Sequence, residues 1–462
     1  MSDGGIKMET MSILDLNFIC QTFDRQLSVT NAAVKRVVID SRTIQAGDVF
    51  VAIRGEHFDG HDFVDDVLAK GALLCIVSRT EFSQDKRCLV VEDTEKALGQ
   101  LAHAWRMTVN PALQVFGITG SAGKTTVKEM LATILRHHAG DQAVLATAGN
   151  FNNHLGLPLT LLQLKTHHRY AVIEMGMNHA GELSYLTRLT CPDYALVNNA
   201  LRAHIGCGFA DVADIARAKS EIYQGLDNQG IGLIPIEDEQ SAIYAAALCD
   251  KRRVTYGIKQ GDVHAENIIL KPLSISFDLQ SPEGVIALHV PVPGLHMVHN
   301  AVAACAMALS AGVPLTDLCA LTNFVNAKGR LQQKRSLRGA LIIDDTYNAN
   351  PDAFRAAVDV LASFPAPRVI VMGAIGELGD NAPALHAEVG AYIRERGIEA
   401  ALFIGDDARY AAAAYGTADA FYESKTDLIA DLRRWDQQMT TILVKGSRFM
   451  HMEDIVSALV EK

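Results

Sequence analysis

The sequence predicts an α/β protein built from three domains, and three observations support this prediction. The chain has 462 residues, which is enough for about three domains of ordinary size. Short apolar runs of the buried-strand type alternate with amphipathic helical segments along most of its length. Hydrophobic residues make up 49% of the sequence and charged residues 21%, which is typical of a folded globular protein.

The first predicted domain, residues 1–112, is a small α/β unit. Between about residues 34 and 110, the strand-like runs VKRVVID, DVFVAI and LLCIVS alternate with the helix-like runs HDFVDDVLAKGA and TEKALGQLAHAWRM. The proline in the following VNPAL is typical of a segment that leaves a domain.

The second predicted domain, residues 113–327, contains a doubly wound and mostly parallel sheet. From Gln114 onward, amphipathic helices separate runs with the apolar character of buried parallel strands, namely QVFGIT, YAVIEMG and DYALVNN. In such a sheet, ligands bind at the carboxyl ends of the strands. Residues 262–293 switch to alternation with a period of two, which predicts a small antiparallel appendage.

The third predicted domain, residues 328–462, is a Rossmann-like α/β unit. After NAKGRLQ, a new series of strand-like runs begins with GALIIDDTYN and continues with RVIVMGA, AALFIG and TTILVKGS. Helical segments separate these runs, so we expect a second parallel sheet here.

Composition and charge exclude several classes of protein. The net charge of −11 argues against nucleic acid or an anionic membrane surface as the main partner, because both favour a basic face. No secretion signal opens the chain, and its longest apolar run, AVAACAMALSAGV, predicts a buried helix rather than a membrane span. Eight cysteines without a C-x-x-C pair favour reduced thiols in the cytoplasm over a disulfide framework or a structural zinc site.

A glycine-rich turn between a strand and a helix predicts a phosphate-binding loop, or P-loop, in the central domain. It lies in QVFGITGSAGKTTVKEMLATIL and comprises Gly120, Ser121, Ala122, Gly123, Lys124, Thr125 and Thr126. The glycines let backbone N–H groups approach a phosphate chain, the lysine adds a cation, and Thr125 offers its hydroxyl to magnesium. The strict G-x-x-x-x-G-K-[ST] pattern is missed because Ile118 stands at its first position. Glycines that only turn the chain would not explain the Lys-Thr-Thr run, so we expect a nucleoside triphosphate as ligand.

Three further side chains map to the same edge of the predicted central sheet. Glu174 ends a buried strand, His204 follows the next one, and Lys219 lies on the apolar stripe of a helix predicted over residues 211–226. Taken singly, each allows a simpler reading: a carboxylate bonded to nearby backbone, a solvated histidine, and a lysine that snorkels or pairs with Glu221. Their convergence with Thr125 instead favours a metal site.

The ordered motifs of the chain resemble those of the Mur ligases of peptidoglycan synthesis. Besides the phosphate loop, the matching segments are GNFNNHLGLP, VIEMGMNHAGEL, NNALRAHIG, ARAKSEIY, PGLHMVHNAVAA, KGRLQ, IIDDTYNANP and LVKGSR. The resemblance extends from about residue 37 to the C-terminus. DSRTIQAGDVFVAIRGEHFDGHDFV and DDTYNANP are most similar to the members that join D-alanyl-D-alanine to UDP-N-acetylmuramoyl-tripeptide.

This resemblance implies ATP-dependent formation of an amide through an acyl phosphate. It implies two magnesium ions, held by Thr125, Glu174, His204 and a Lys219 that carbon dioxide has carbamylated, with Lys124 on the phosphates. A carbamate would also explain an otherwise unfavourable lysine, because an anion beside a divalent ion is stabilised where an ammonium is repelled. The expected enzyme is a cytoplasmic monomer.

The resemblance also assigns residues to the substrates. Asn300 and Asp345 would contact the nucleoside, and Arg330 would reach the phosphates from the third domain, so catalysis would require domain closure. The uridine nucleotide would lie on Asp40, Ser41 and Arg42, and the muramoyl-peptide near Asn150, Asn152 and Asn153.

Three positions depart from the family's usual pattern: Met297 replaces an asparagine, Ala374 an aspartate and Gly206 an acidic residue. Two other interpretations remain open. One is a related ligase that adds a single amino acid, such as diaminopimelate, lysine or glutamate. The other is a nucleotide-driven switch without ligase activity.

Overall fold

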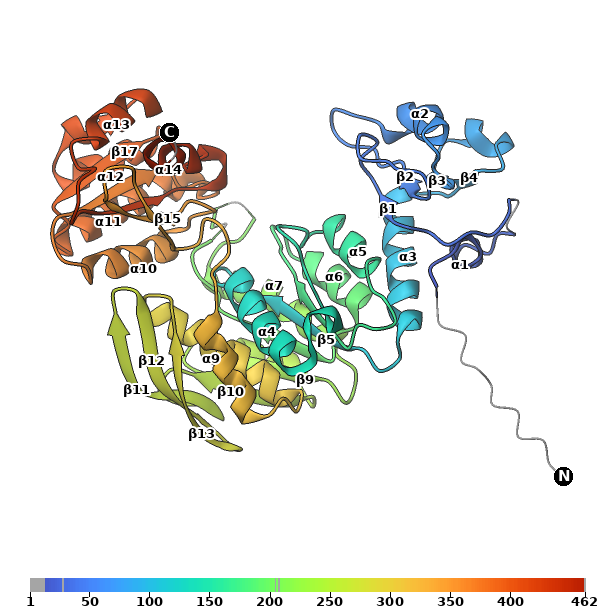
Figure 1. The fold of residues 1–462 in the computed structure, drawn as a ribbon, viewed down its shortest axis with the longest axis horizontal. Coiled ribbons are helices and arrows are strands. Elements are labelled where there is room, and N and C mark those ends of the chain that lie inside the picture. Colours follow the sequence, from blue (N-terminus) through green and yellow to red (C-terminus); the bar gives the residue numbers. More distant parts are fainter. Residues whose placement is uncertain (1–12, 27–28, 204, 207, 461–462) are drawn as a thin grey trace.

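A computed structural model describes residues 13–26, 29–203, 205–206 and 208–460. Within these residues the chain forms three sheets, of four, nine and six strands. Figure 1 shows that each sheet lies in its own body and that the three bodies follow one another in chain order. The α/β fold class predicted from the sequence is confirmed.

The N-terminal sheet is parallel, with strand order β1-β2-β3-β4. Its elements are α1 (Leu16–Thr22), β1 (Val37–Val38), β2 (Val49–Val51), α2 (Val64–Ala69), β3 (Leu74–Val77), β4 (Cys88–Val90) and α3 (Thr94–Val109). Helix α3 packs on the central domain, where Trp105 Nε1 donates to Leu164 O at 3.1 Å and Arg106 Nε donates to Thr190 O at 3.0 Å. Figure 1 shows α3 as the connection between the two bodies.

The central sheet has the order β13-β12-β11-β10-β9-β8-β5-β7-β6. Its strands are β5 (Gln114–Thr119), β6 (Val144–Ala146), β7 (Tyr170–Glu174), β8 (Tyr194–Val197), β9 (Ile231–Pro235), β10 (Arg252–Gly257), β11 (Val263–Lys271), β12 (Ser274–Ser281) and β13 (Gly284–Val290). Strand β11 pairs in parallel with β10 and antiparallel with β12. The predicted antiparallel segment therefore exists, but it extends the central sheet instead of standing apart from it.

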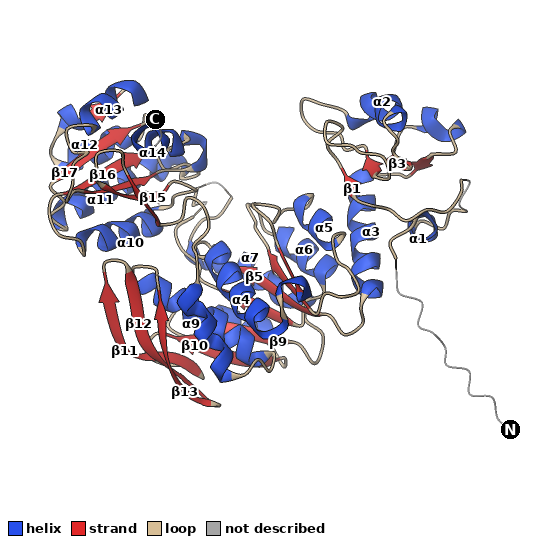
Figure 2. Ribbon diagram, viewed as in Figure 1, coloured by secondary structure: helices blue, strands red, loops and turns tan. Residues whose placement is uncertain are grey.

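Helices cover both faces of the central sheet, as Figure 2 shows. They are α4 (Lys124–Ala139), α5 (Gly156–Leu161), α6 (Glu182–Thr190), α7 (Val212–Ser220), α8 (Ser241–Leu248) and α9 (Leu295–Ser310). Alternate residues of β5 face opposite sides: Phe116 packs in the core with α4 and α9, whereas Val115 packs in the core with α5, α6 and α7. Helix α9 is buried along nearly its whole length, as its apolar sequence predicts.

The C-terminal sheet has the order β14-β15-β19-β16-β17-β18, parallel except at β14. Its strands are β14 (Gln332–Arg335), β15 (Leu341–Asp345), β16 (Arg368–Gly373), β17 (Ala400–Ile404), β18 (Phe421–Tyr422) and β19 (Thr441–Lys445). Its helices are α10 (Pro351–Ala362), α11 (Ala382–Glu395), α12 (Ala408–Tyr415), α13 (Lys425–Leu432) and α14 (Glu453–Val460). The four strand-like runs predicted in this region are β15, β16, β17 and β19.

One predicted helix is shorter than expected. The α-helical part of residues 211–226 is α7, which ends at Ser220, and residues 221–225 continue as a 3-10 turn. The Thr187 hydroxyl donates to the Ile222 carbonyl at 2.7 Å, which fixes that turn against α6. Hydrophobic periodicity does not distinguish the two helix types over so short a stretch.

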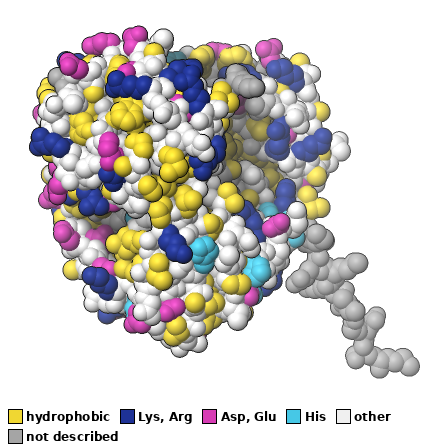
Figure 3. Space-filling view, turned by 60° about the vertical axis from the view of Figure 1, so that its left-hand side comes forward, with side chains coloured by type: hydrophobic (Ala, Val, Ile, Leu, Met, Phe, Trp, Pro, Cys, Tyr) yellow, Lys and Arg dark blue, Asp and Glu magenta, His cyan; other side chains and the backbone are white. Residues whose placement is uncertain are grey.

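The surface carries charges of both signs. On the face that Figure 3 shows, basic and acidic side chains are interspersed. Among the described residues, no helix combines the length and the apolar character that a membrane crossing requires.

Candidate active site

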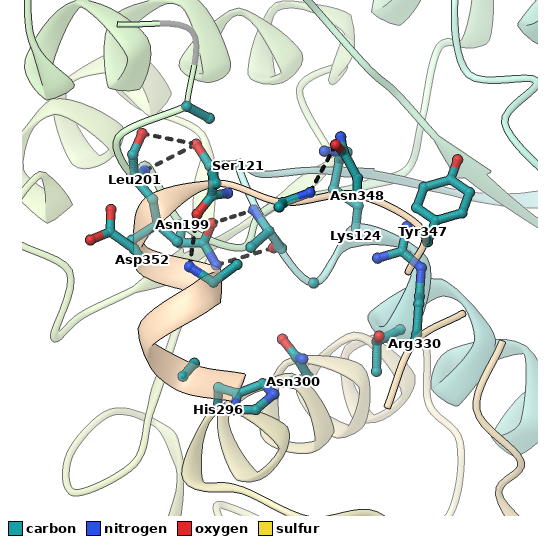
Figure 4. A pocket seen from close by; sticks show the side chains of 18 of the residues that line it. Ser121, Lys124, Asn199, Leu201, His296, Asn300, Arg330, Tyr347, Asn348 and Asp352 are labelled. Carbon is teal, nitrogen blue, oxygen red and sulfur yellow. Dashed lines mark hydrogen bonds between the residues drawn. The ribbon is translucent and has the colours of Figure 1, made fainter. Parts of the chain in front are cut away.

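A cleft of about 1500 Å³ lies between the central and C-terminal domains. Its walls are the phosphate loop, the loops that follow β6 and β7, the first turn of α9, and the loop between β15 and α10. Figure 4 shows side chains of the phosphate loop, of the segment after β8, of α9 and of the loop after β15 around one space. The carboxyl ends of β5, β7 and β8 meet here, as the doubly wound topology predicts.

The phosphate loop connects β5 to α4 in a conformation that requires glycine. Gly123 has a φ of +80°, and a Cβ there would lie 2.5 Å from both Asn198 Nδ2 and Asn300 Oδ1. The N-terminus of α4 points its free N–H groups toward the cleft, which suits an anion. Lys124 lies across the loop, with Nζ donating to Gly120 O at 2.6 Å.

Two asparagines that the sequence analysis did not single out hold the phosphate loop in place. Asn199 Oδ1 accepts from Ala122 N at 2.9 Å, and Asn199 Nδ2 donates to Ala122 O at 3.1 Å (Figure 4). Asn198 Nδ2 donates to Ala122 O and to Asn300 Oδ1, both at 2.9 Å. Asn198 Oδ1 is buried without a hydrogen-bond partner among the described residues. Their only signal in the sequence is their position directly after β8, and that signal is weak because asparagine is common in loops.

Glu174 lies at the end of β7 beside the phosphate loop. Its carboxylate is buried, and it accepts from Thr125 Oγ1 and from Asn152 Nδ2, each at 2.8 Å. Both donors are side chains from other segments, so the simpler reading of a carboxylate bonded to nearby backbone is wrong. Arg330, 205 residues further along the chain than Thr125, donates from Nη2 to Thr125 Oγ1 at 2.8 Å.

Lys219 is buried on α7, with 2% of its surface exposed. Its Nζ makes no hydrogen bond or ion pair with any residue that the structure describes. Glu221 is engaged elsewhere, because its carboxylate accepts from the backbone N–H groups of Gly181 and Ser184. Lys219 therefore neither snorkels nor pairs with Glu221. Burial, reinforced by the charge of Lys124, lowers the pKa of Lys219 well below its ordinary range.

The structure describes three of the four proposed metal ligands. His204 lies outside the described residues. Within the described ranges, no three His, Cys, Asp or Glu side chains gather as a metal cluster. Thr125 and Glu174 nevertheless fit magnesium, which is commonly held by one or two protein oxygens together with phosphate oxygens and water.

Asn300 lies in the first turns of α9, on the floor of the cleft. Its Oδ1 accepts from Asn198 Nδ2, and its Nδ2 lies 3.7 Å from the sulfur of Met297. The neighbouring His296 and His299 also line the cleft, and burial lowers the pKa of each to about 4. Both imidazoles are therefore neutral near pH 7.

Arg330 lies in the linker between the central and C-terminal domains, and Asp345 holds this linker in place. Asp345 Oδ1 accepts from Leu331 N at 3.1 Å, and Asp345 Oδ2 accepts from Lys445 Nζ at 2.6 Å. The guanidinium of Arg330 lies over the ring of Tyr347, with its central carbon 4.3 Å from the ring centre. This contact restricts the side chain, because a cation is attracted to the face of an aromatic ring.

The residues expected to bind the uridine nucleotide and the muramoyl-peptide lie in two places. Asn150, Asn152 and Asn153 line the cleft. Asp40, Ser41 and Arg42 follow β1 in the N-terminal domain and do not line it. Asp40 and Arg42 form a surface ion pair with an N–O distance of 2.8 Å, and this hydrogen-bonded pairing lowers the pKa of Asp40 to about 2.

Comparisons with known proteins identify the family. Models described as the Mur ligase family catalytic domain, the Mur ligase middle domain and the Mur ligase glutamate ligase domain match residues 33–106, 118–308 and 329–448. A UDP-N-acetylmuramoyl-tripeptide–D-alanyl-D-alanine ligase of Haemophilus influenzae is 39% identical over 440 residues, which cover 94% of this chain and 95% of that protein. The chain belongs to the Mur ligase family. The ligase of the same name from Escherichia coli is also 39% identical, over 98% of this chain and 99% of that protein.

Solved Mur ligase structures share the whole three-domain fold. A crystal structure of MurF from Acinetobacter baumannii has a TM-score of 0.90 and 38% identity, and the match covers 98% of this chain and 100% of that one. MurF ligase from Thermotoga maritima, in complex with ADP, has a TM-score of 0.80 and 25% identity, over 92% and 97% of the two chains.

The three departures from the usual Mur ligase pattern lie at different places in the structure. Met297 is buried, and its sulfur lies beside the Asn300 amide. Ala374 is buried in the C-terminal domain, where Gly405 packs against it. Gly206 lies against the C-terminal domain so closely that a Cβ would be 3.1 Å from Leu378 O.

Proposed function

We propose that this Mur ligase joins D-alanyl-D-alanine to UDP-N-acetylmuramoyl-tripeptide, with conversion of ATP to ADP and phosphate. The reaction would serve peptidoglycan precursor synthesis, and through it cell wall biogenesis, cell shape and division during the cell cycle. The observation that carries this proposal is the 39% identity, over 94–98% of the chain, to two ligases named for this reaction. The phosphate loop and Glu174 support it, because they place an anion site and a buried carboxylate in one cleft.

The proposed chemistry has two steps. An oxygen of the tripeptide carboxylate attacks the γ-phosphorus, the bond to the bridging oxygen of ADP breaks, and an acyl phosphate forms. The amine nitrogen of D-alanyl-D-alanine then attacks the acyl carbon, phosphate leaves, and the nitrogen loses a proton. The chain supplies positioning and charge neutralisation rather than a nucleophile.

The phosphate loop would bind the triphosphate. Its N–H groups and those at the N-terminus of α4 would donate to the phosphate oxygens, with Lys124 moving from Gly120 O to the phosphates. Arg330 already reaches Thr125 from the linker, so its guanidinium would neutralise charge on the same phosphates. Asn300 and Asp345, which lie on the two sides of the cleft, would contact the nucleoside.

Two magnesium ions would be held by Thr125, Glu174, His204 and a modified Lys219. Bound there, the ions would neutralise charge on the transferring phosphoryl group and on the attacking carboxylate. The Thr125 hydroxyl and the Glu174 carboxylate fit the first ion, because they are oxygen ligands that meet beside the phosphate loop. The buried Asn198 Oδ1, which has no partner among the described residues, is a further oxygen in this region.

Lys219 would join the second metal site as a carbamate. The lone pair of its neutral amine attacks the carbon of CO₂, an N–C bond forms, and a proton leaves to solvent. The support for this modification is the burial of Lys219 and its lack of a partner among the described residues. A carbamate replaces an unpaired nitrogen with two metal-binding oxygens.

We divide the work between three domains. Residues 1–112 would bind the uridine nucleotide through Asp40, Ser41 and Arg42, residues 113–327 would bind ATP, and residues 328–462 would close over it. Asn150, Asn152 and Asn153 would lie along the muramoyl-peptide. We also propose that the enzyme acts as a monomer in the cytoplasm.

The decisive experiment measures ATP-dependent phosphate release with D-alanyl-D-alanine against single amino acids, each with UDP-N-acetylmuramoyl-tripeptide or its dipeptide precursor. We expect release only with D-alanyl-D-alanine, and mass spectrometry should detect the new amide. Release only with a single amino acid would replace the proposal with another ligase of the family. Hydrolysis without any acceptor or amide product would indicate a nucleotide-driven switch.

The carbamate is tested separately. The intact mass of the native protein should exceed the sequence mass by one carboxylate, and this added group should map to Lys219. Lys219→Ala should lose activity, with partial rescue by a small carboxylate. An unmodified side chain during turnover would contradict the proposed metal site.

A further inference from the structure

Arg202 connects the central domain to the C-terminal domain. Its guanidinium donates to Asp352 Oδ1 from Nε at 3.1 Å and from Nη2 at 2.6 Å. The same group donates from Nη1 to Glu388 Oε2 at 2.7 Å and from Nη2 to Glu388 Oε1 at 2.9 Å. The backbone N–H of Arg202 donates to Asp352 Oδ2 at 3.0 Å. One residue therefore binds two carboxylates of the neighbouring domain.

Contacts within the C-terminal domain hold both carboxylates in position. Asp352 lies in the first turn of α10, where the positive end of the helix favours a carboxylate. Glu388 lies on α11 and also accepts from Arg355 Nη1 at 2.8 Å, within the same domain. Arg355 in turn lies over the ring of Tyr392, 4.3 Å from its centre. Preorganised acceptors of this kind suit the planar fork of a guanidinium.

The segment that carries Arg202, residues 198–202, is bonded on its other side to the phosphate loop. Leu201 N donates to Ser121 Oγ at 3.0 Å, and Ser121 N donates to Asn199 O at 3.1 Å. The Asn199 side chain closes two further bonds with Ala122. Figure 4 shows Asn199 and Leu201 beside Ser121, with Asp352 near the same segment.

We propose that Arg202 is a positioning residue that couples closure of the C-terminal domain to the arrangement of the phosphate loop. The segment 198–202 can transmit this coupling because it is bonded to both partners within five residues. The inference rests on the proposed function only in that the nucleotide is ATP.

Arg202 has this effect through charge as well as through hydrogen bonds. The three side chains are partly buried, with 28% of Arg202, 25% of Asp352 and 34% of Glu388 exposed, so solvent screens their attraction incompletely. Without Arg202, both carboxylates of the C-terminal domain would lose their partner across the boundary, and the closed arrangement would lose the ion pairs that favour it. A nucleotide that needs the closed arrangement would then bind more weakly.

The test compares Arg202→Gln with the matched control Arg355→Gln. Arg355 also bonds Glu388, but that bond does not cross the domain boundary. The probe is a non-hydrolysable ATP analogue with magnesium, and the measurements are its Kd and the radius of gyration by X-ray scattering. For Arg202→Gln we expect at least fivefold weaker binding and a larger radius with the analogue bound. Arg355→Gln should match the unmodified enzyme within twofold.

Kinetics and a conservative variant complete the test. Amide formation at saturating substrates should fall about tenfold or more in Arg202→Gln and be partly restored in Arg202→Lys, which reaches one carboxylate instead of two. If both glutamine variants bind and contract like the unmodified enzyme, or if both lose binding equally, the inference is overturned. Should Arg202→Gln bind the analogue more weakly and contract less than the unmodified enzyme while neither forms the amide, the proposed function fails and the coupling stands.

Discussion

Replacing Lys219 by methionine should make the protein more stable while it abolishes catalysis. Lys219 is 2% exposed, and no described residue accepts a hydrogen bond from it. Taking a polar group out of water costs about 1–3 kcal/mol where hydrogen bonds do not compensate it, and burial favours the neutral amine by lowering its pKa. Methionine has a similar length and volume, so its repacking should cost less than about 1.5 kcal/mol. We expect Lys219→Met to raise the free energy of unfolding by about 1 kcal/mol.

The assay is thermal unfolding in buffer stripped of carbon dioxide. For a domain of roughly 200 residues, each kcal/mol shifts Tm by about 2–4 °C. Lys128→Met is the matched control, because Lys128 is equally buried but donates to Thr147 O at 2.6 Å and pairs with Glu129. That variant should lose about 1–3 kcal/mol, since it leaves the Thr147 carbonyl unsatisfied. Bicarbonate with magnesium should stabilise only proteins that retain Lys219. A Lys219→Met protein less stable than the parent in stripped buffer would refute this reasoning.

Three further predictions concern the cleft and its supports. Glu174→Gln should reduce kcat at least a hundredfold, measured as amide formation at saturating substrates, because an amide has one oxygen fewer for the metal and for Thr125. Arg330→Lys should raise KM for ATP at least tenfold, since an ammonium cannot keep both the stacking and the directed hydrogen bond; an unchanged KM would contradict that role. His386 Nε2 accepts a hydrogen bond from Ile375 N, and burial lowers the pKa of its imidazole from the ordinary value of 6.5. Below pH 6.5, this imidazole therefore binds more protons in the unfolded chain than in the folded protein. Stability should therefore fall as pH drops below about 6.5, and urea unfolding at pH 5 and 7 should show a smaller loss for His386→Gln.

Local features of the fold were predictable from the sequence. The phosphate loop lies where a strand, a glycine turn and a helix follow one another, because all three are encoded within about twenty residues. Burial of Lys219 follows from its place on an apolar stripe. The attachment of β11 to β10 was not predictable, because a period of two shows which face is buried but does not identify the neighbouring strand.

Long-range contacts in the cleft could not be predicted from local sequence patterns. The bond between Arg330 and Thr125 joins residues 205 positions apart, and no local pattern encodes such a contact. Asn198 and Asn199 were missed for a different reason: asparagine is common in loops, so its presence after a strand carries little information. Only the structure shows that both side chains hold the phosphate loop.

The docking of α3 fixes the distance between the N-terminal domain and the phosphate loop. Trp105 and Arg106 bond to carbonyls of the central domain. In the proposed function, the uridine end and the phosphoryl end of the substrate would therefore be set at one spacing. Each residue of an extended peptide spans about 3.3–3.6 Å. A precursor one residue shorter would present its carboxylate that far from the γ-phosphate, so selection for peptide length would be built into the frame of the molecule and would need no side chain to read the missing residue.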